Sequence, residues 1–97
     1  MNKEQELLRI SNPKLVQEKA LNILGPNAII YYSIRKNKKY MIQNPINKNW
    51  VHFGEMGFSD YTKHNDPKRL MNFKLRNESW RQYEPYTPAF LSYYLLW

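Results

Sequence analysis

The chain contains no cysteine, which excludes disulfides, thiolate metal sites and a cysteine nucleophile. It has no apolar run near the roughly 18 residues that a membrane-spanning helix needs. Its first residues, MNKEQELLRIS, are polar and charged where a signal peptide would be apolar. These absences predict a soluble protein of the cell interior that is neither secreted nor bound to a membrane, and they are compatible with a reducing compartment.

Acidic residues are also scarce. Eight Asp and Glu stand against fifteen Lys and Arg, which gives a formal net charge of +7. Residues 35–81 hold eleven of these cations and only four of the acids, so this part of the chain alone carries a net charge of +7. Such an excess of one sign is expected of a surface that meets an anion.

The length of 97 residues predicts a single domain, residues 1–97, and leaves room for residues 1–12 to be a frayed arm. Hydrophobic residues make up 42% of the chain and aromatic residues 15%, a composition that excludes a disordered protein. Part of the core is expected to consist of Tyr and Trp, whose polar tips need hydrogen-bond partners.

Two helices are predicted in the N-terminal third. Residues 3–10 are expected to form a short helix. A better-marked helix follows Asn12, a residue that caps helix N-termini, with Pro13 at its first position. It is expected to end at Gly25 as a left-handed cap, followed by Pro26. The apolar side chains of this helix recur at helical spacing and form one stripe: Val16, Ala20, Ile23 and Leu24.

The next part of the chain has the alternation and composition of β-strands. Three segments rich in β-branched and aromatic residues predict an antiparallel meander, namely residues 28–34, 40–42 and 50–53. The polar turn at residues 35–39 joins the first two, and Asn37 is the natural place in it for a positive φ.

The third predicted strand is expected to show Trp50 and His52 on one face of the sheet, and Val51 and Phe53 on the other. Gly54 and Gly57 follow directly and indicate a bulge or a tight turn with unusual backbone angles.

Two further helices are predicted after the strands. Asp66 and Pro67 repeat the capping pattern and begin a helix that runs to about Asn77. Leu70 and Phe73 point to one side of it, whereas the face with Arg69, Asn72 and Arg76 is cationic. Thr87-Pro88 begins a last helix, and residues 89–97 are almost entirely apolar or aromatic, so this segment is buried in its own fold or against a partner.

These elements together predict an α+β fold. A small three-stranded antiparallel meander packs with an N-terminal helix, a basic middle helix and a short apolar C-terminal helix.

The cations after residue 60 are interleaved with aromatic residues, as is typical of nucleic-acid-binding surfaces. Cations neutralise phosphates, and aromatic rings stack on exposed bases. A solvated charged face is the alternative interpretation. The turn at residues 35–39 either extends the same surface or is simply a soluble turn. The candidate nucleic-acid-binding residues are Tyr61, Lys63, His64, Lys68, Arg69, Lys74, Arg76, Trp80, Arg35, Lys36, Lys38 and Lys39.

One group of residues would suit a metal or a catalytic site: His52, Asp60, His64 and Asp66. Imidazole and carboxylate groups bind divalent metals, and such a site can cleave phosphodiesters. The spacing fits no established metal or hydrolase motif. We therefore interpret Asp66 as a helix cap, Asp60 as a partner of loop backbone, and the histidines as structural or phosphate-contacting groups. We expect no metal, no cofactor and no enzymatic activity, with a metal-dependent nuclease as an alternative.

Three segments of the chain resemble a family of small basic proteins from nucleocytoplasmic large DNA viruses, with related pieces in large phages. They are Lys38–Ile42, Val51–Arg69 and Pro88–Trp97. The resemblance covers about residues 36–97, and its most specific part runs from His52 to Arg69. This family is uncharacterised, so the resemblance implies no catalytic residue. It implies a viral protein with a role in the virion or on the genome, in the cytoplasm or nucleus of the host cell.

These observations lead to two functional hypotheses. The first is a non-enzymatic protein that binds DNA, RNA or another polyanion mainly through phosphates and without base specificity. The second is a structural or minor virion protein that docks on another protein through its aromatic C-terminus, residues 90–97.

Overall fold

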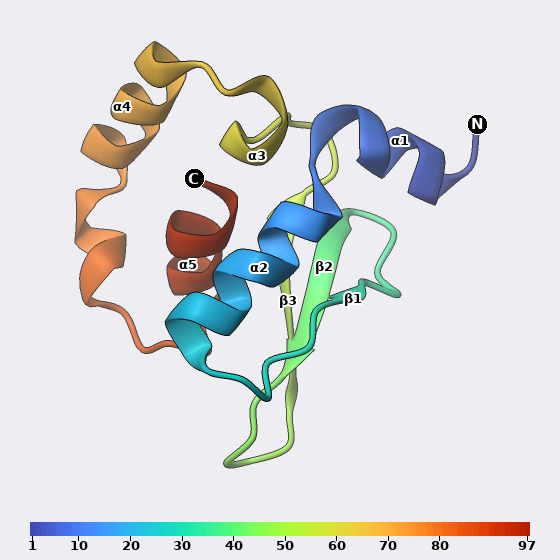
Figure 1. The fold of residues 1–97 in the computed structure, drawn as a ribbon, viewed down its shortest axis with the longest axis vertical. Helices are drawn as coiled ribbons and strands as arrows, with labels where there is room; N and C mark the ends of the chain where they lie inside the picture. The colour runs from blue at the N-terminus through green and yellow to red at the C-terminus, as the bar shows by residue number, and fades with distance from the viewer.

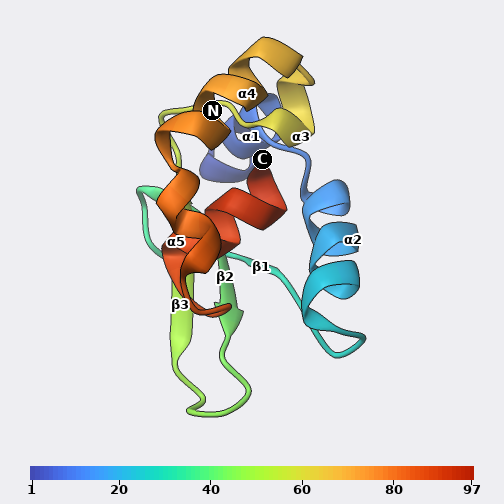
Figure 2. The same ribbon diagram turned by 90° about the vertical axis from the view of Figure 1, so that its left-hand side faces the viewer.

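The computed structural model covers residues 1–97 and confirms the predicted α+β fold (Figures 1 and 2). A three-stranded antiparallel sheet with the strand order β1-β2-β3 packs with helices. None of the helices combines the length and the apolar character of a membrane span. In chain order the elements are α1 (Lys3–Ile10), α2 (Pro13–Leu24), β1 (Tyr31–Tyr32), β2 (Lys38–Gln43), β3 (Trp50–Glu55), α3 (Tyr61–His64), α4 (Pro67–Arg76), the 3-10 helix η1 (Glu78–Gln82), α5 (Pro88–Leu91) and the π-helical η2 (Ser92–Leu96).

Residues 1–12 are not a frayed arm, because α1 is capped and packed. The Asn2 side chain accepts a hydrogen bond from the Gln5 backbone, and the Gln5 side chain accepts one from the Asn2 backbone. This reciprocal capping box satisfies two free backbone donors at the start of the helix. Leu7 is buried in the core, and Ser11 is buried directly after the helix. A single well-placed leucine therefore anchors a helix whose overall composition is polar.

The second helix follows its sequence signals closely. Asn12 caps α2 by accepting a hydrogen bond from the Leu15 backbone at 3.3 Å. Val16 and Ala20 are fully buried, whereas Ile23 at the edge of the predicted stripe is exposed. Gly25 has the expected positive φ of 110°, but its ψ of 174° shows that it is not a left-handed helical cap.

The first strand is much shorter than predicted. The backbone just before β1 forms hydrogen bonds with a side chain of α2 and not with β2. The Gln17 side chain donates to the carbonyl oxygen of Ala28 at 2.9 Å and accepts from the backbone of Ile30 at 2.8 Å. Only Tyr31 and Tyr32 pair with β2. The positive φ predicted at Asn37 is also wrong, since among residues other than glycine only Lys48 and Asn65 adopt one.

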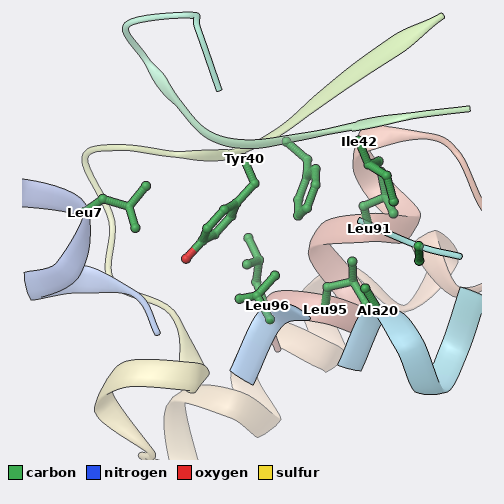
Figure 3. Packing of buried hydrophobic residues seen from close by; sticks show 10 residues of the cluster. Leu7, Ala20, Tyr40, Ile42, Leu91, Leu95 and Leu96 are labelled. Carbon is green, nitrogen blue, oxygen red and sulfur yellow. The ribbon is translucent and has the colours of Figure 1, made fainter. Parts of the chain in front are cut away.

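Buried apolar side chains from both ends of the chain meet on one face of the sheet (Figure 3). In the register of β2 and β3, Tyr40 lies opposite Phe53, and all of the strand residues in the core come from these two strands. The C-terminal segment packs against both α2 and β3. The core consists of Leu7, Val16, Ala20, Ala28, Tyr40, Ile42, Phe53, Leu91, Leu95 and Leu96.

Candidate functional site

The basic helix α4 lies along one side of the molecule, at the left of Figure 1. Asp66 caps it by accepting hydrogen bonds from the backbones of Lys68 at 3.0 Å and Arg69 at 3.3 Å. Asn65, with a φ of 54°, ends α3 in the left-handed conformation. This tight turn sets the direction in which α4 leaves the body of the protein.

The predicted cationic face of α4 borders a cavity of about 550 Å³. Arg69, Asn72 and Arg76 all line it, so the structure brings these three residues together as their spacing predicts. The other walls come from β2, from the end of β3 and the loop after it, from η1 and from the C-terminal segment. The other lining residues are Lys39, Gly54, Glu55, Phe58, Ser59, Phe73, Trp80, Ser92, Leu96 and Trp97.

The two arginines of this face have unused hydrogen-bonding capacity. Both Arg69 and Arg76 are exposed, and neither takes part in a salt bridge or donates a hydrogen bond from its side chain. A guanidinium group presents five N–H donors in a planar fork that matches phosphate and carboxylate oxygens. The face is therefore chemically suited to an anion.

Aromatic rings line the same cavity as these arginines. Phe73 stacks on Trp97 with ring centroids 4.4 Å apart and planes inclined by 7°. Trp80 meets Phe73 edge-on at 5.9 Å. Phe58 borders the same cavity but remains 69% exposed. Trp80 was predicted as a stacking group, whereas Phe58 and Trp97 were not, because their contribution depends on how distant segments meet.

Lys39 is not available to a phosphate, which corrects its place among the candidate residues. Its ammonium group lies 2.9 Å from a carboxylate oxygen of Asp60, and both side chains are almost completely buried. Burial lowers the pKa of Lys39, and the neighbouring Asp60 carboxylate opposes this shift. The hairpin sequence gives no sign of this pairing, since the partner lies 21 residues further along the chain.

Asp60 is the centre of a buried polar network that joins three parts of the fold. Its carboxylate accepts hydrogen bonds from the backbone and the hydroxyl of Thr62. The Thr62 and Ser11 hydroxyl oxygens are 3.3 Å apart, and Tyr40 donates its hydroxyl proton to Ser11 at 2.6 Å. Burial of this phenol raises the pKa of Tyr40. Asp60 was expected to bond loop backbone, but its carboxylate instead caps the N-terminus of α3, and its role extends to β2 and to the α1–α2 junction.

Lys74 also points into the protein. Its ammonium group donates a hydrogen bond to the carbonyl oxygen of Tyr93 at 2.6 Å and lies 3.6 Å from the centroid of the Tyr93 ring. Burial, together with the positive charges of Lys19 and Arg81, lowers the pKa of Lys74 to about 8. Lys74 therefore fixes α4 to the C-terminal segment and is not a free phosphate contact.

The lowered pKa makes the stability of the protein depend on pH in a defined window. Between pH 8 and 10.5 the unfolded chain binds more protons at Lys74 than the folded protein does, so the free energy of unfolding contributed by this residue rises with pH. We expect wild type to gain stability relative to Lys74→Met between about pH 7 and about pH 10, as measured by urea denaturation. The exposed Lys63→Met is the control. A Lys74→Met difference that stays constant across the window would contradict the titration of Lys74.

His64 does not serve as a cation. Its Nδ1 accepts a hydrogen bond from the backbone of Asp66 at 3.0 Å, and its Nε2 is buried without a partner. Burial and the nearby Arg69 guanidinium lower the pKa of His64, so the ring is neutral at pH 7. Tyr61 meets this ring edge-on with centroids 6.0 Å apart, and Trp97 packs against it at 5.1 Å with the ring planes inclined by 55°. His64 and Tyr61 are thus packing partners at the α3–α4 turn.

The β1–β2 turn lies beside α1, on the side of the molecule opposite α4 (Figure 1). Arg35 and Lys36 are exposed there, and Lys38 pairs with Glu55. Lys36 faces a separate hollow shared with Arg9 of α1. The turn therefore does not extend the surface of α4. The candidate cations that remain exposed and unpaired on α3 and α4 are Lys63, Lys68, Arg69 and Arg76, and of these the two arginines line the cavity.

The histidines and acids considered for a metal site are engaged separately. The Nδ1 of His52 lies 2.6 Å from the Ser33 hydroxyl, Asp60 pairs with Lys39, and Asp66 caps α4. No group of three His, Asp or Glu side chains is arranged to hold a metal ion. The alternative of a metal-dependent nuclease is therefore not supported by any cluster of metal-binding side chains.

No curated protein and no solved structure matches the chain. A family model described as "Family of unknown function (DUF5754)" matches residues 28–77, which contain the sheet, α3 and α4. The match begins earlier than the expected resemblance from residue 36, and it leaves out residues 78–97. Because the match covers more than half of the chain, the protein belongs to this family of unknown function, DUF5754.

Proposed function

We propose that the protein binds nucleic acid, DNA or RNA, or another polyanion through phosphate contacts from α4, without a catalytic step. The observation that carries the proposal is the pair Arg69 and Arg76, which are exposed, unpaired and placed on one face of the helix. Lys63 of α3 and Lys68 of α4 add further exposed charge. Arg35 and Lys36 form a second, separate group of cations.

The spacing of the two arginines suits a chain of phosphates. They are two helical turns apart, which separates their backbones by roughly 10 Å along the axis. Each guanidinium can then engage a different phosphate in a bidentate manner. Contacts of this kind depend on charge and shape more than on base identity, so binding is expected without sequence preference.

The resemblance to small basic proteins of nucleocytoplasmic large DNA viruses supports a viral setting for this activity. In that setting the protein acts on the genome or in the virion, within the cytoplasm or nucleus of the host cell. The alternative of docking through residues 90–97 has weaker support, because Leu91, Leu95 and Leu96 of this segment are buried in the protein's own core.

Salt dependence tests the proposal directly. Replacing Arg69 and Arg76 together by Gln is expected to weaken binding to a labelled duplex and to reduce the slope of log Kd against log salt by about 2, or about 0.9 per lost phosphate contact. Fluorescence anisotropy between about 50 and 200 mM salt measures this slope.

A matched control changes the net charge equally at a distant place. Arg9 and Lys14 are exposed on α1 and α2, and their joint replacement by Gln is expected to leave the slope nearly unchanged. Equal losses in both double variants would show that only net charge matters. Binding that shows no salt dependence in wild type would refute the proposed function itself.

A further inference from the structure

The cavity beside α4 is lined by cationic side chains and by aromatic rings, and this combination restricts the chemistry of its ligand. Its size of about 550 Å³ falls within the roughly 300–1,000 Å³ typical of small-ligand sites. From these walls we propose that the cavity binds one unpaired nucleotide of a single-stranded nucleic acid, with the base against the aromatic wall and a phosphate at the arginines. The inference rests on the proposed function and narrows its substrate class.

The aromatic wall is suited to the flat face of a base. Phe73 and Trp97 are held in a parallel stack, and Trp80 is fixed edge-on against Phe73. Their orientation is set by packing within the protein before any ligand arrives. Stacking of a base on such rings is worth about 1–3 kcal/mol and tolerates all four bases.

Phe58 is the part of this wall that the fold does not use. The ring borders the cavity and is 69% exposed, in the loop between β3 and α3. Neither the core cluster nor the hydrophobic residues packed against it include Phe58. An exposed phenylalanine at the edge of a site with two free arginines is well placed to cover the second face of a bound base.

The polar groups distinguish a nucleotide from simpler ligands. Asn72 lies between the two arginines on α4 and offers both a donor and an acceptor to a base edge. Glu55, which pairs with Lys38 through one oxygen, also borders the cavity and can accept hydrogen bonds from amino groups of bases. A purely apolar ligand would leave both guanidinium groups without a partner. A ligand with a planar ring and a phosphate can place the ring against the aromatic side chains and the phosphate at the guanidinium groups.

A base in this cavity has to be unpaired. In a duplex the faces of the bases are stacked on their neighbours, and exposing one of them costs a few kcal/mol. Single strands present their bases freely. The protein is therefore expected to bind a single-stranded oligonucleotide more tightly than a duplex of equal length, in addition to the charge-driven binding that both share.

Phe58→Ala tests the inference without threatening the fold, since the ring is exposed. We expect Phe58→Ala to weaken binding to an oligothymidylate roughly tenfold, as loss of about 1.4 kcal/mol of stacking would do, while duplex binding changes by less than about twofold. Tyr83→Ala removes another exposed ring, which does not line the cavity, and is expected to leave binding to both the oligothymidylate and the duplex unchanged. Thermal melting verifies that all variants are folded.

The outcomes separate this inference from the proposed function. Equal affinity of wild type for oligothymidylate and duplex, or equal effects of Phe58→Ala on both, would overturn the nucleotide site. The salt-dependent contribution of Arg69 and Arg76 would be untouched by that result. Absence of salt-dependent binding to either probe would refute the proposed function, and the inference with it.

Discussion

Lys39→Met is expected to lower the free energy of unfolding by about 3–5 kcal/mol, the range for removing one partner of a buried ion pair. The Lys39 and Asp60 side chains are 2% and 1% exposed, so removal of the ammonium group would leave a carboxylate buried with no opposite charge. The expected loss of stability does not require a strong attraction between Lys39 and Asp60. The effect arises because the remaining charge is cut off from water. Denaturation by urea measures the loss.

The neighbouring pair provides the control, because Lys38 and Glu55 form the same kind of contact at the surface. Their side chains are 25% and 52% exposed, and Lys38→Met is expected to cost less than about 1 kcal/mol. The double variant Lys39→Met with Asp60→Asn should regain most of the stability, since Asn keeps an acceptor for the Thr62 backbone and buries no charge. Similar losses for Lys39→Met and Lys38→Met would contradict the buried pair.

Gly54→Ala is expected to destabilise the fold by about 2–4 kcal/mol, because two unfavourable effects act together. The backbone of Gly54 has a φ of 82°, which residues with a Cβ rarely adopt. A Cβ at this position would also lie 2.9 Å from a methyl carbon of Leu96 and 3.1 Å from Cδ of Lys39. The substitution would push the C-terminal segment away from β3. Urea denaturation is again the measurement.

Substitutions at the two other glycines separate the effect of the positive φ from the effect of the steric contact. Gly25 has a φ of 110° but open space around it, so Gly25→Ala should show the backbone effect alone, about 1–3 kcal/mol. Gly57 has neither a positive φ nor a close neighbour, and Gly57→Ala should change stability by less than about 1 kcal/mol. If Gly54→Ala costs no more than Gly25→Ala, the contact with Leu96 is not a steric constraint.

The features that the sequence predicted well are those set by neighbouring residues. Asn12, Asp66 and Thr87 were each expected to begin a helix, and each accepts a hydrogen bond from a backbone N–H two or three residues later. Capping depends on only a few consecutive residues. The cationic face of α4 was likewise readable from helical spacing, and the structure confirms that Arg69, Asn72 and Arg76 lie together.

The features that the sequence did not reveal depend on segments far apart in the chain. The basic sequence at residues 35–39 does not distinguish Lys39, which is buried in β2, from Lys36, which is exposed in the turn. Lys74 turns inward because Tyr93, 19 residues later, supplies a carbonyl oxygen and a ring. The cavity itself exists only because the C-terminal segment comes to lie beside α4. Charge pattern alone therefore overstated the number of cations available to a ligand.

The buried network around Asp60 restricts how this protein can change over evolution. Loss of Lys39 or Asp60 alone leaves an isolated buried charge, whereas loss of both together is tolerable when apolar or neutral groups replace them. Substitutions accumulate one at a time, so the protein passes through a destabilised single variant whether Lys39 or Asp60 is replaced first. Descendants of this chain are accordingly expected to keep the pair intact or to have exchanged both members, and a lineage with only one of them should carry a new partner nearby.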